Sequence, residues 1–152
     1  MQSSSADLSA APKRGRNHRH IVIIDDDARD LQFMASMADA WRDPAVSVDC
    51  FTSVNDALAR LVETKPDLVL LDDQLGAGER AEGSLERMQR AGFAGAVAII
   101  SGYTTPGRRE GLVRAGAFSF VSKDSFDSAG LKLLLDMAAA RDRVFRPKAL
   151  CA

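Results

Sequence analysis

The chain has 152 residues, of which 46% are hydrophobic and 27% charged, and its formal net charge is −1. This length and balance favour a single soluble globular domain, and the near-neutral charge argues against bulk binding of nucleic acid. No run approaches the roughly 20 apolar residues that span a bilayer, and the N-terminus lacks the apolar segment of a secretory signal. Two cysteines make no disulfide framework, so we expect a cytoplasmic location, with Cys50 as a small core residue.

The first 19 residues differ from the rest because they show no apolar periodicity. Four basic residues stand against one acidic residue there. We expect residues 1–19 to form a disordered basic leader, and the alternative is a weak contact with an anion or a membrane surface. Residues 20–145 are the expected folded domain, and residues 146–152 are the expected C-terminal tail.

Short apolar runs and helical patterns alternate from residue 20 onward. Asp43-Pro44 and Pro66 are expected helix ends, and Pro106 is expected in a first helical turn. This alternation predicts an α/β doubly wound fold, (βα)5, with a five-stranded parallel sheet and helices on both faces. The predicted elements in chain order are strand 20–25, helix 28–42, strand 46–53, helix 54–65, strand 67–72, loop 74–83, helix 84–93, strand 96–101, helix 106–117, strand 118–123 and helix 128–145.

Polar side chains stand at the ends of four of these strands. Asp25 and Asp26 end the first strand, and Asp72 ends the third. Ser101 ends the fourth strand and Lys123 the fifth. Because ligands of open parallel sheets bind outside the carboxyl ends of the strands, we expect these groups to converge in one cleft.

The chemistry of these groups favours a metal and a phosphoryl group. Carboxylates that lie close together repel one another and lose hydration, so one would stay protonated without a cation. Mg²⁺ removes this conflict because it prefers carboxylates, water and phosphate oxygens. A lysine and a hydroxyl in the same cleft suit an incoming phosphoryl group.

In this order and spacing, Asp25-Asp26, Asp72, Ser101 and Lys123 resemble the response-regulator receiver domain of bacterial two-component signalling. The resemblance extends from residue 20 to about residue 143, and it includes "RAGAFSFVSK" before and at the lysine. It implies the flavodoxin-like receiver version of the (βα)5 fold.

The resemblance also implies a role for each matching position. Asp72 would be the phosphoacceptor, a carboxylate nucleophile that forms an acyl phosphate. Asp25, Asp26, Asp72 and the backbone carbonyl of Gln74 would bind Mg²⁺. Lys123 would contact the phosphoryl group.

Further positions would serve switching and hydrolysis. Ser101 would hydrogen-bond the phosphoryl group after transfer, and Gly102 would leave room for its entry. Phe120 would be the switch aromatic that turns inward when Ser101 moves. Gln74 and Tyr103 occupy the positions that tune hydrolysis of the acyl phosphate in the family.

Several residues depart from the family pattern or have a plainer interpretation. Asp124 follows the lysine, where the family usually has proline. Asp73 is an extra acid that points to solvent or perturbs metal affinity. Arg108 and Arg109 fit a solvated helix face, or else partner contacts. Asp30 is expected to favour the N-terminus of the first helix through its dipole.

The resemblance implies a stand-alone, single-domain response regulator, because only seven residues follow residue 145. Its expected partners are a histidine kinase or histidine phosphotransfer protein and a downstream protein target, with no DNA. Output would pass through the face of the fourth helix, fifth strand and fifth helix, from a monomer or a phosphorylation-dependent homodimer. Any catalysis would be limited to its own phosphorylation and dephosphorylation.

Two other functions are open. One is a receiver-like binding module that works without phosphorylation, which would have no need of the full set of site residues. The other is a small phosphatase with an aspartate nucleophile, which Asp25-x-Asp27 fits loosely. Against the phosphatase, Ala28 stands where such enzymes usually carry Thr or Val, and no cap insert is present.

Overall fold

The computed structural model describes residues 18–76, 78–102 and 105–145, with the backbone alone for 142–145. Residues 1–17 of the predicted leader, Tyr103 and the predicted tail therefore lie outside the described residues. In the part of the chain that is described, no helix combines the length and the apolar content needed to cross a membrane.

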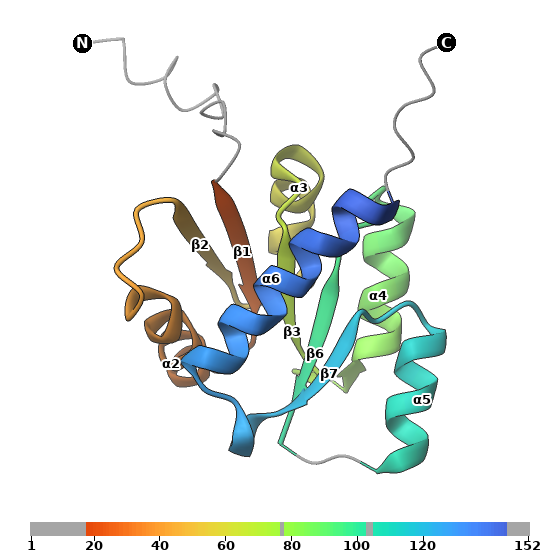
Figure 1. The fold of residues 1–152 in the computed structure, drawn as a ribbon. Helices are drawn as coiled ribbons and strands as arrows, with labels where there is room; N and C mark the ends of the chain where they lie inside the picture. The colour runs from red at the N-terminus through yellow and green to blue at the C-terminus, as the bar shows by residue number, and fades with distance from the viewer. Residues whose placement is uncertain (1–17, 77, 103–104, 146–152) are drawn as a thin grey trace, which may run out of the picture.

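A five-stranded sheet forms the centre of the domain, as predicted (Figure 1). Its strand order is β2-β1-β3-β6-β7, and every neighbouring pair is parallel. Every residue of β3 and β6 is buried, which explains why their sequences are apolar without alternation. The strands are β1 (Arg19–Ile24), β2 (Val46–Phe51), β3 (Leu68–Asp72), β6 (Val97–Ser101) and β7 (Ser119–Ser122).

Helices cover both faces of this sheet. The residues of α2 and α6 pack on one face, and those of α3, α4 and α5 pack on the other. Figure 1 shows α6 crossing in front of the strands, with α3 behind them. The helices are α2 (Ala28–Asp39), α3 (Val54–Thr64), α4 (Ala81–Arg90), α5 (Pro106–Arg114) and α6 (Ser128–Phe145).

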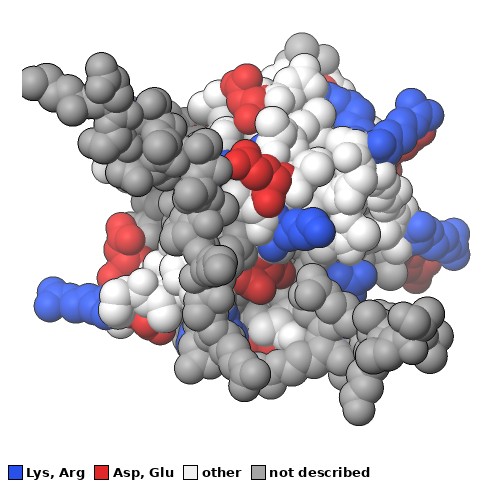
Figure 2. Space-filling view, turned by 90° about the horizontal axis from the view of Figure 1, so that it is seen from above, with Lys and Arg blue, Asp and Glu red and all other residues white. Residues whose placement is uncertain are grey.

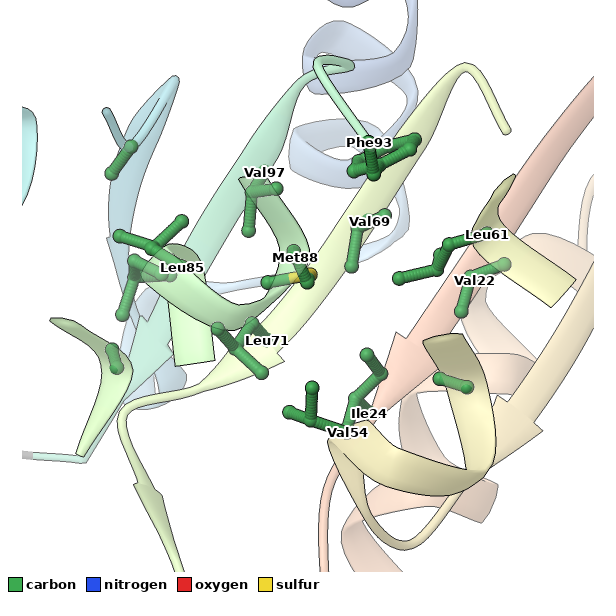
Figure 3. Packing of buried hydrophobic residues seen from close by; sticks show 14 of the residues in the cluster. Val22, Ile24, Val54, Leu61, Val69, Leu71, Leu85, Met88, Phe93 and Val97 are labelled. Carbon is green, nitrogen blue, oxygen red and sulfur yellow. The ribbon is translucent and has the colours of Figure 1, made fainter. Parts of the chain in front are cut away.

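Two cores result, because successive strand side chains point to opposite faces. In β3, Val69 and Leu71 face α3 and α4. Met88 of α4 packs against these two residues (Figure 3). Leu68 and Leu70 face α2 and α6 instead. The pleat therefore decides which helices each residue at the end of a strand can reach.

The helix ends follow local chemistry. Asp27 caps α2 by accepting a hydrogen bond from the Arg29 N–H at 2.8 Å. Ser53 caps α3 by accepting from the Asp56 N–H at 3.2 Å. Lys65 has a φ of 47° and ends α3 just before the predicted stop at Pro66.

Three features differ from the sequence predictions. The expected loop 74–83 contains a small hairpin of β4 (Gln74–Leu75) and β5 (Glu79–Arg80), and α4 begins at Ala81 instead of residue 84. Gly78, with a φ of 74°, permits the tight turn of this hairpin. A 3₁₀ turn, η1 (Lys123–Ser125), follows β7. Cys50 is exposed on edge strand β2, so its assignment to the core is wrong.

Candidate functional site

The carboxyl ends of β1 and β3 bring three predicted acids together. Asp25 and Asp26 follow β1, and Asp72 is the last residue of β3. One carboxylate oxygen from each of the three lies within 4.8 Å of the others. Three hard oxygen donors so close together fit a divalent cation such as Mg²⁺.

Burial makes this acidic group electrostatically unfavourable on its own. Asp25 is fully buried, and it accepts a hydrogen bond from the Asp27 N–H at 2.9 Å. Burial raises the pKa of Asp25, although this hydrogen bond and the charge of Lys123 oppose the effect. Burial also raises the pKa of Asp72 to about 6, with the charge of Asp25 adding to it and Lys123 opposing it. A cation between the acids would remove this repulsion.

Lys123 is the cation that the fold supplies. Its Nζ lies 2.7 Å from Asp30, 3.2 Å from Asp25 and 3.4 Å from Asp72. Burial lowers the pKa of Lys123, but the ion pairs outweigh burial and hold this pKa above its ordinary value. Asp30 is thus more than an acid in the first turn of α2, because it also holds the lysine. No pattern in the sequence indicated this contact between residues 93 positions apart.

A pocket of about 570 Å³ opens beside Asp72. A Cβ atom built on Gly102 would meet nothing within 4 Å, so this glycine adds to the open space. The lining combines three cations with two acids and hydroxyl groups, which suits an anionic guest bound next to a carboxylate. The lining residues are Asp72, Asp73, Gln74, Arg80, Ser101, Gly102, Thr105, Arg108 and Lys123.

The remaining predicted site residues fall in different places. Ser101 ends β6, is buried and lines the pocket. Gln74 lies in β4, and its N–H donates to the Asp72 carboxylate. Phe120 lies in the core on the face of α3, α4 and α5, so its ring is already turned inward. Tyr103 lies outside the described residues.

Asp73 and Arg108 form a partly buried ion pair that sequence reasoning missed. Asp73 is 4% exposed, so the expectation that it points to solvent is wrong. Arg108 donates to both oxygens of Asp73, through Nε at 3.2 Å and through Nη2, and it donates to Glu82 through Nη1. The expectation of a solvated face is wrong for Arg108, whereas Arg109 is exposed. The pleat was a usable signal, because Asp73 continues the Val69–Leu71 side of β3.

Asp124 makes use of an atom that proline lacks. Its backbone N–H donates to the Ser122 hydroxyl at 3.3 Å and begins η1. No peptide bond among the described residues is cis. The turn after Lys123 is therefore built from an ordinary trans backbone with a side-chain cap.

The opposite end of the sheet has a different surface. Figure 2 looks onto the end where the strands begin, and outside the grey atoms it shows small groups of red and blue side chains among white ones. Neither sign of charge forms a broad patch on the visible part of that face.

A comparison with protein families and a comparison with solved structures both found receiver domains. A family model described as the response regulator receiver domain matches residues 21–135. A response regulator receiver domain from Clostridium thermocellum is 20% identical, with a TM-score of 0.71 over 83% of this chain and 98% of that chain. The signal receiver domain of the putative response regulator NarL from Mycobacterium tuberculosis is 21% identical, with a TM-score of 0.68 over 82% and 99%.

The receiver domain of NtrX from Brucella abortus is 22% identical, with a TM-score of 0.68 over 79% of this chain and 98% of that chain. At such identities these likenesses show the shared fold alone. No curated protein matches the chain.

Proposed function

Because the chain belongs to the response regulator receiver domain family, we propose that it is a signalling switch that accepts a phosphoryl group on Asp72. Its donor would be a histidine kinase or a histidine phosphotransfer protein. An Asp72 carboxylate oxygen attacks the phosphorus, the bond from phosphorus to the donor nitrogen breaks, and its electron pair leaves with the donor. The product is an acyl phosphate, a mixed anhydride.

Asp25, Asp26, Asp72 and the backbone carbonyl of Gln74 would hold Mg²⁺. The metal supplies charge neutralisation for the phosphoryl oxygens and for the acids around it. Lys123 already lies 3.4 Å from Asp72, so a small movement of its flexible chain would bring it to a phosphoryl oxygen. Ser101 would donate its hydroxyl to another oxygen of the group.

Switching would begin at Ser101 and pass to the face of α5, β7 and α6. This face would bind the downstream protein target in the cytoplasm. The protein would act as a monomer or as a homodimer formed on phosphorylation. Phe120, whose ring is already turned inward in this structure, would keep that position in the phosphorylated state. Gln74 and Tyr103 would set the rate at which the acyl phosphate is hydrolysed. Phosphorylation shifts the equilibrium between two states only by the difference in its affinity for them.

The observation that carries this proposal is the meeting of three carboxylates and Lys123 beside an open pocket. The phosphatase alternative has less support, because the carboxylate of Asp27 caps α2. A binding module that works without phosphorylation has no need of the unfavourable buried contact between the Asp25 and Asp72 carboxylates.

Intact mass measured after incubation with Mg²⁺ and acetyl phosphate tests the proposal. We expect the mass of one phosphoryl group to be added, and we expect none in Asp72→Asn or in the presence of EDTA. A gain that persists in Asp72→Asn would place the phosphoryl group elsewhere. If neither acetyl phosphate nor a phosphorylated histidine phosphotransfer protein adds mass, the binding module becomes the better explanation.

A further inference from the structure

Arg108 joins three elements at the edge of the pocket. It stands in the first turn of α5, and it binds Asp73 after β3 and Glu82 in the first turn of α4. The Arg108 side chain is 16% exposed and that of Asp73 is 6% exposed. These hydrogen bonds occupy Nε, Nη1 and Nη2 of the guanidinium group.

The acidic side of this contact is fixed, whereas the helix side is weakly held. The Asp73 N–H donates to the Ile100 carbonyl, and the Asp73 carbonyl accepts from the Ala81 N–H. Among the nine residues of α5, all of which are described, only Leu112 is buried. Through its ion pairs, Arg108 therefore connects the first turn of α5 to the end of β3 and to α4.

The resting contact also leaves an acid incompletely satisfied. Glu82 Oε1 is buried and has no hydrogen-bond partner among the described residues. One guanidinium thus serves two carboxylates, one of which keeps a desolvated oxygen. Because the side chain of Glu82 is otherwise 45% exposed, it can turn to water if Arg108 leaves.

A phosphoryl group on Asp72 would change the balance of charge around Arg108. Arg108 and Asp72 line the same pocket, and Asp73 is the residue next to Asp72. Phosphorylation replaces a single negative charge with a group of about −2, and a guanidinium fork matches its oxygens better than a lysine does. The added charge therefore competes with Asp73 and Glu82 for Arg108.

We propose that the Arg108 side chain changes partners, leaving Asp73 and Glu82 to bind the phosphoryl group on Asp72. This inference rests on the proposed function. The transfer draws the first turn of α5 toward the pocket. Arg108 then links chemistry at the end of β3 to the position of a helix on the proposed output face.

Titration with beryllofluoride in Mg²⁺, followed by NMR, tests the transfer because beryllofluoride imitates a phosphoryl group on a carboxylate. Asp73→Asn frees Arg108, so the affinity should rise several-fold. Arg108→Gln removes the ligand, so the affinity should fall about tenfold, the usual worth of a hydrogen bond to a charged group. The affinity of Arg108→Lys for beryllofluoride should lie between that of the wild type and that of Arg108→Gln.

Two further measurements separate this role from a structural one. The Arg108 Nε–H signal of the wild type should shift on titration, and Arg109→Gln, an exposed neighbour, should bind beryllofluoride as the wild type does. Glu82→Gln provides a second release of Arg108 if Asp73→Asn fails to fold, and it should also raise the affinity. Thermal unfolding of each variant establishes that it is folded.

The direction of the two main changes decides the outcome. If Asp73→Asn and Arg108→Gln both raise the affinity, the contact only restrains the resting state, and the transfer is wrong. If both lower it or leave it unchanged, Arg108 is a structural residue, and the transfer is again wrong. If the wild type binds no beryllofluoride, and Asp72→Asn behaves identically, the proposed function fails and this inference fails with it.

Discussion

The carboxyl group of Asp72 is poised between two states of charge in the metal-free protein. Its pKa is about 6 in the folded chain, against an ordinary value of 3.8, because burial and Asp25 disfavour the anion. A group whose pKa is raised by folding stabilises the fold below its unfolded pKa, and this contribution is lost as the pH rises through the folded value. At pH 8 the ionised side chain therefore destabilises the protein.

We predict that Asp72→Asn raises the free energy of unfolding of the metal-free protein at pH 8. The gain should be about 1–3 kcal/mol, from roughly 1.4 kcal/mol for each unit of pKa shift. It should shrink below pH 6 and vanish only below the ordinary pKa of 3.8. Urea unfolding in EDTA at several pH values measures this, with the exposed substitution Glu63→Gln as the control. A variant less stable than the wild type at pH 8 would contradict the assigned repulsion.

At this site the sequence predicted which residues stand at the strand ends, but it did not predict which side chains contact one another. The predicted site residues stand at or just after the ends of recognisable strands, and parallel strands end at one edge; these residues are Asp25, Asp26, Asp72, Ser101 and Lys123. The contacts of Asp30 with Lys123 and of Asp73 with Arg108 depend on how helices lie against the sheet. The pleat gives the side to which Asp73 points, but it does not say which cation reaches that side.

Elements built on a strong apolar pattern were predicted to within a few residues. Helix α6, predicted over 128–145, buries one stripe at helical spacing, which consists of Leu131, Leu134, Leu135 and Ala138. On another side of the same helix, Lys132 and Asp136 form an ion pair at 3.8 Å. The β4–β5 hairpin was missed because two-residue strands carry no periodicity, and glycine-rich segments are typical of loops.

Helix α6 allows a matched test of its buried face. Leu135 is fully buried, whereas Leu133, two residues earlier, is 61% exposed. Leu135→Ala should lower the free energy of unfolding by about 2–5 kcal/mol, because it removes apolar contacts and leaves a cavity. Leu133→Ala should change it by less than about 0.5 kcal/mol. Urea denaturation of both variants measures this, and equal losses would show that the packed face is wrongly assigned.

At the scale of the whole molecule, one sheet serves two cores. Each of β1, β3 and β6 contributes alternate residues to both sides, so the loss of either helix layer would expose the same strands. The molecule should therefore unfold in one cooperative transition, as small single domains usually do. Trp41, the only tryptophan, packs at the margin of the α2–α6 core and reports on that side.

We predict that Mg²⁺ shifts the unfolding of both cores together. Trp41 fluorescence and far-ultraviolet circular dichroism should give coincident curves, and saturating Mg²⁺ should move both by the same amount. At a concentration 100 times its Kd, Mg²⁺ should add about 2.7 kcal/mol, and EDTA should abolish the gain. Separate transitions for the two probes, or a shift in only one, would contradict a single cooperative unit.

Lys123 and Asp25 meet across 98 positions of the chain. During synthesis the acids of β1 and β3 leave the ribosome long before Lys123, which directly follows β7. Until β7 docks at the edge of the sheet, the nascent chain holds acids with no internal counter-charge and no complete place for a guest. Under the proposed function, a chain can therefore accept a phosphoryl group only after β7 has joined the sheet. Incompletely folded chains would not be phosphorylated and would not signal.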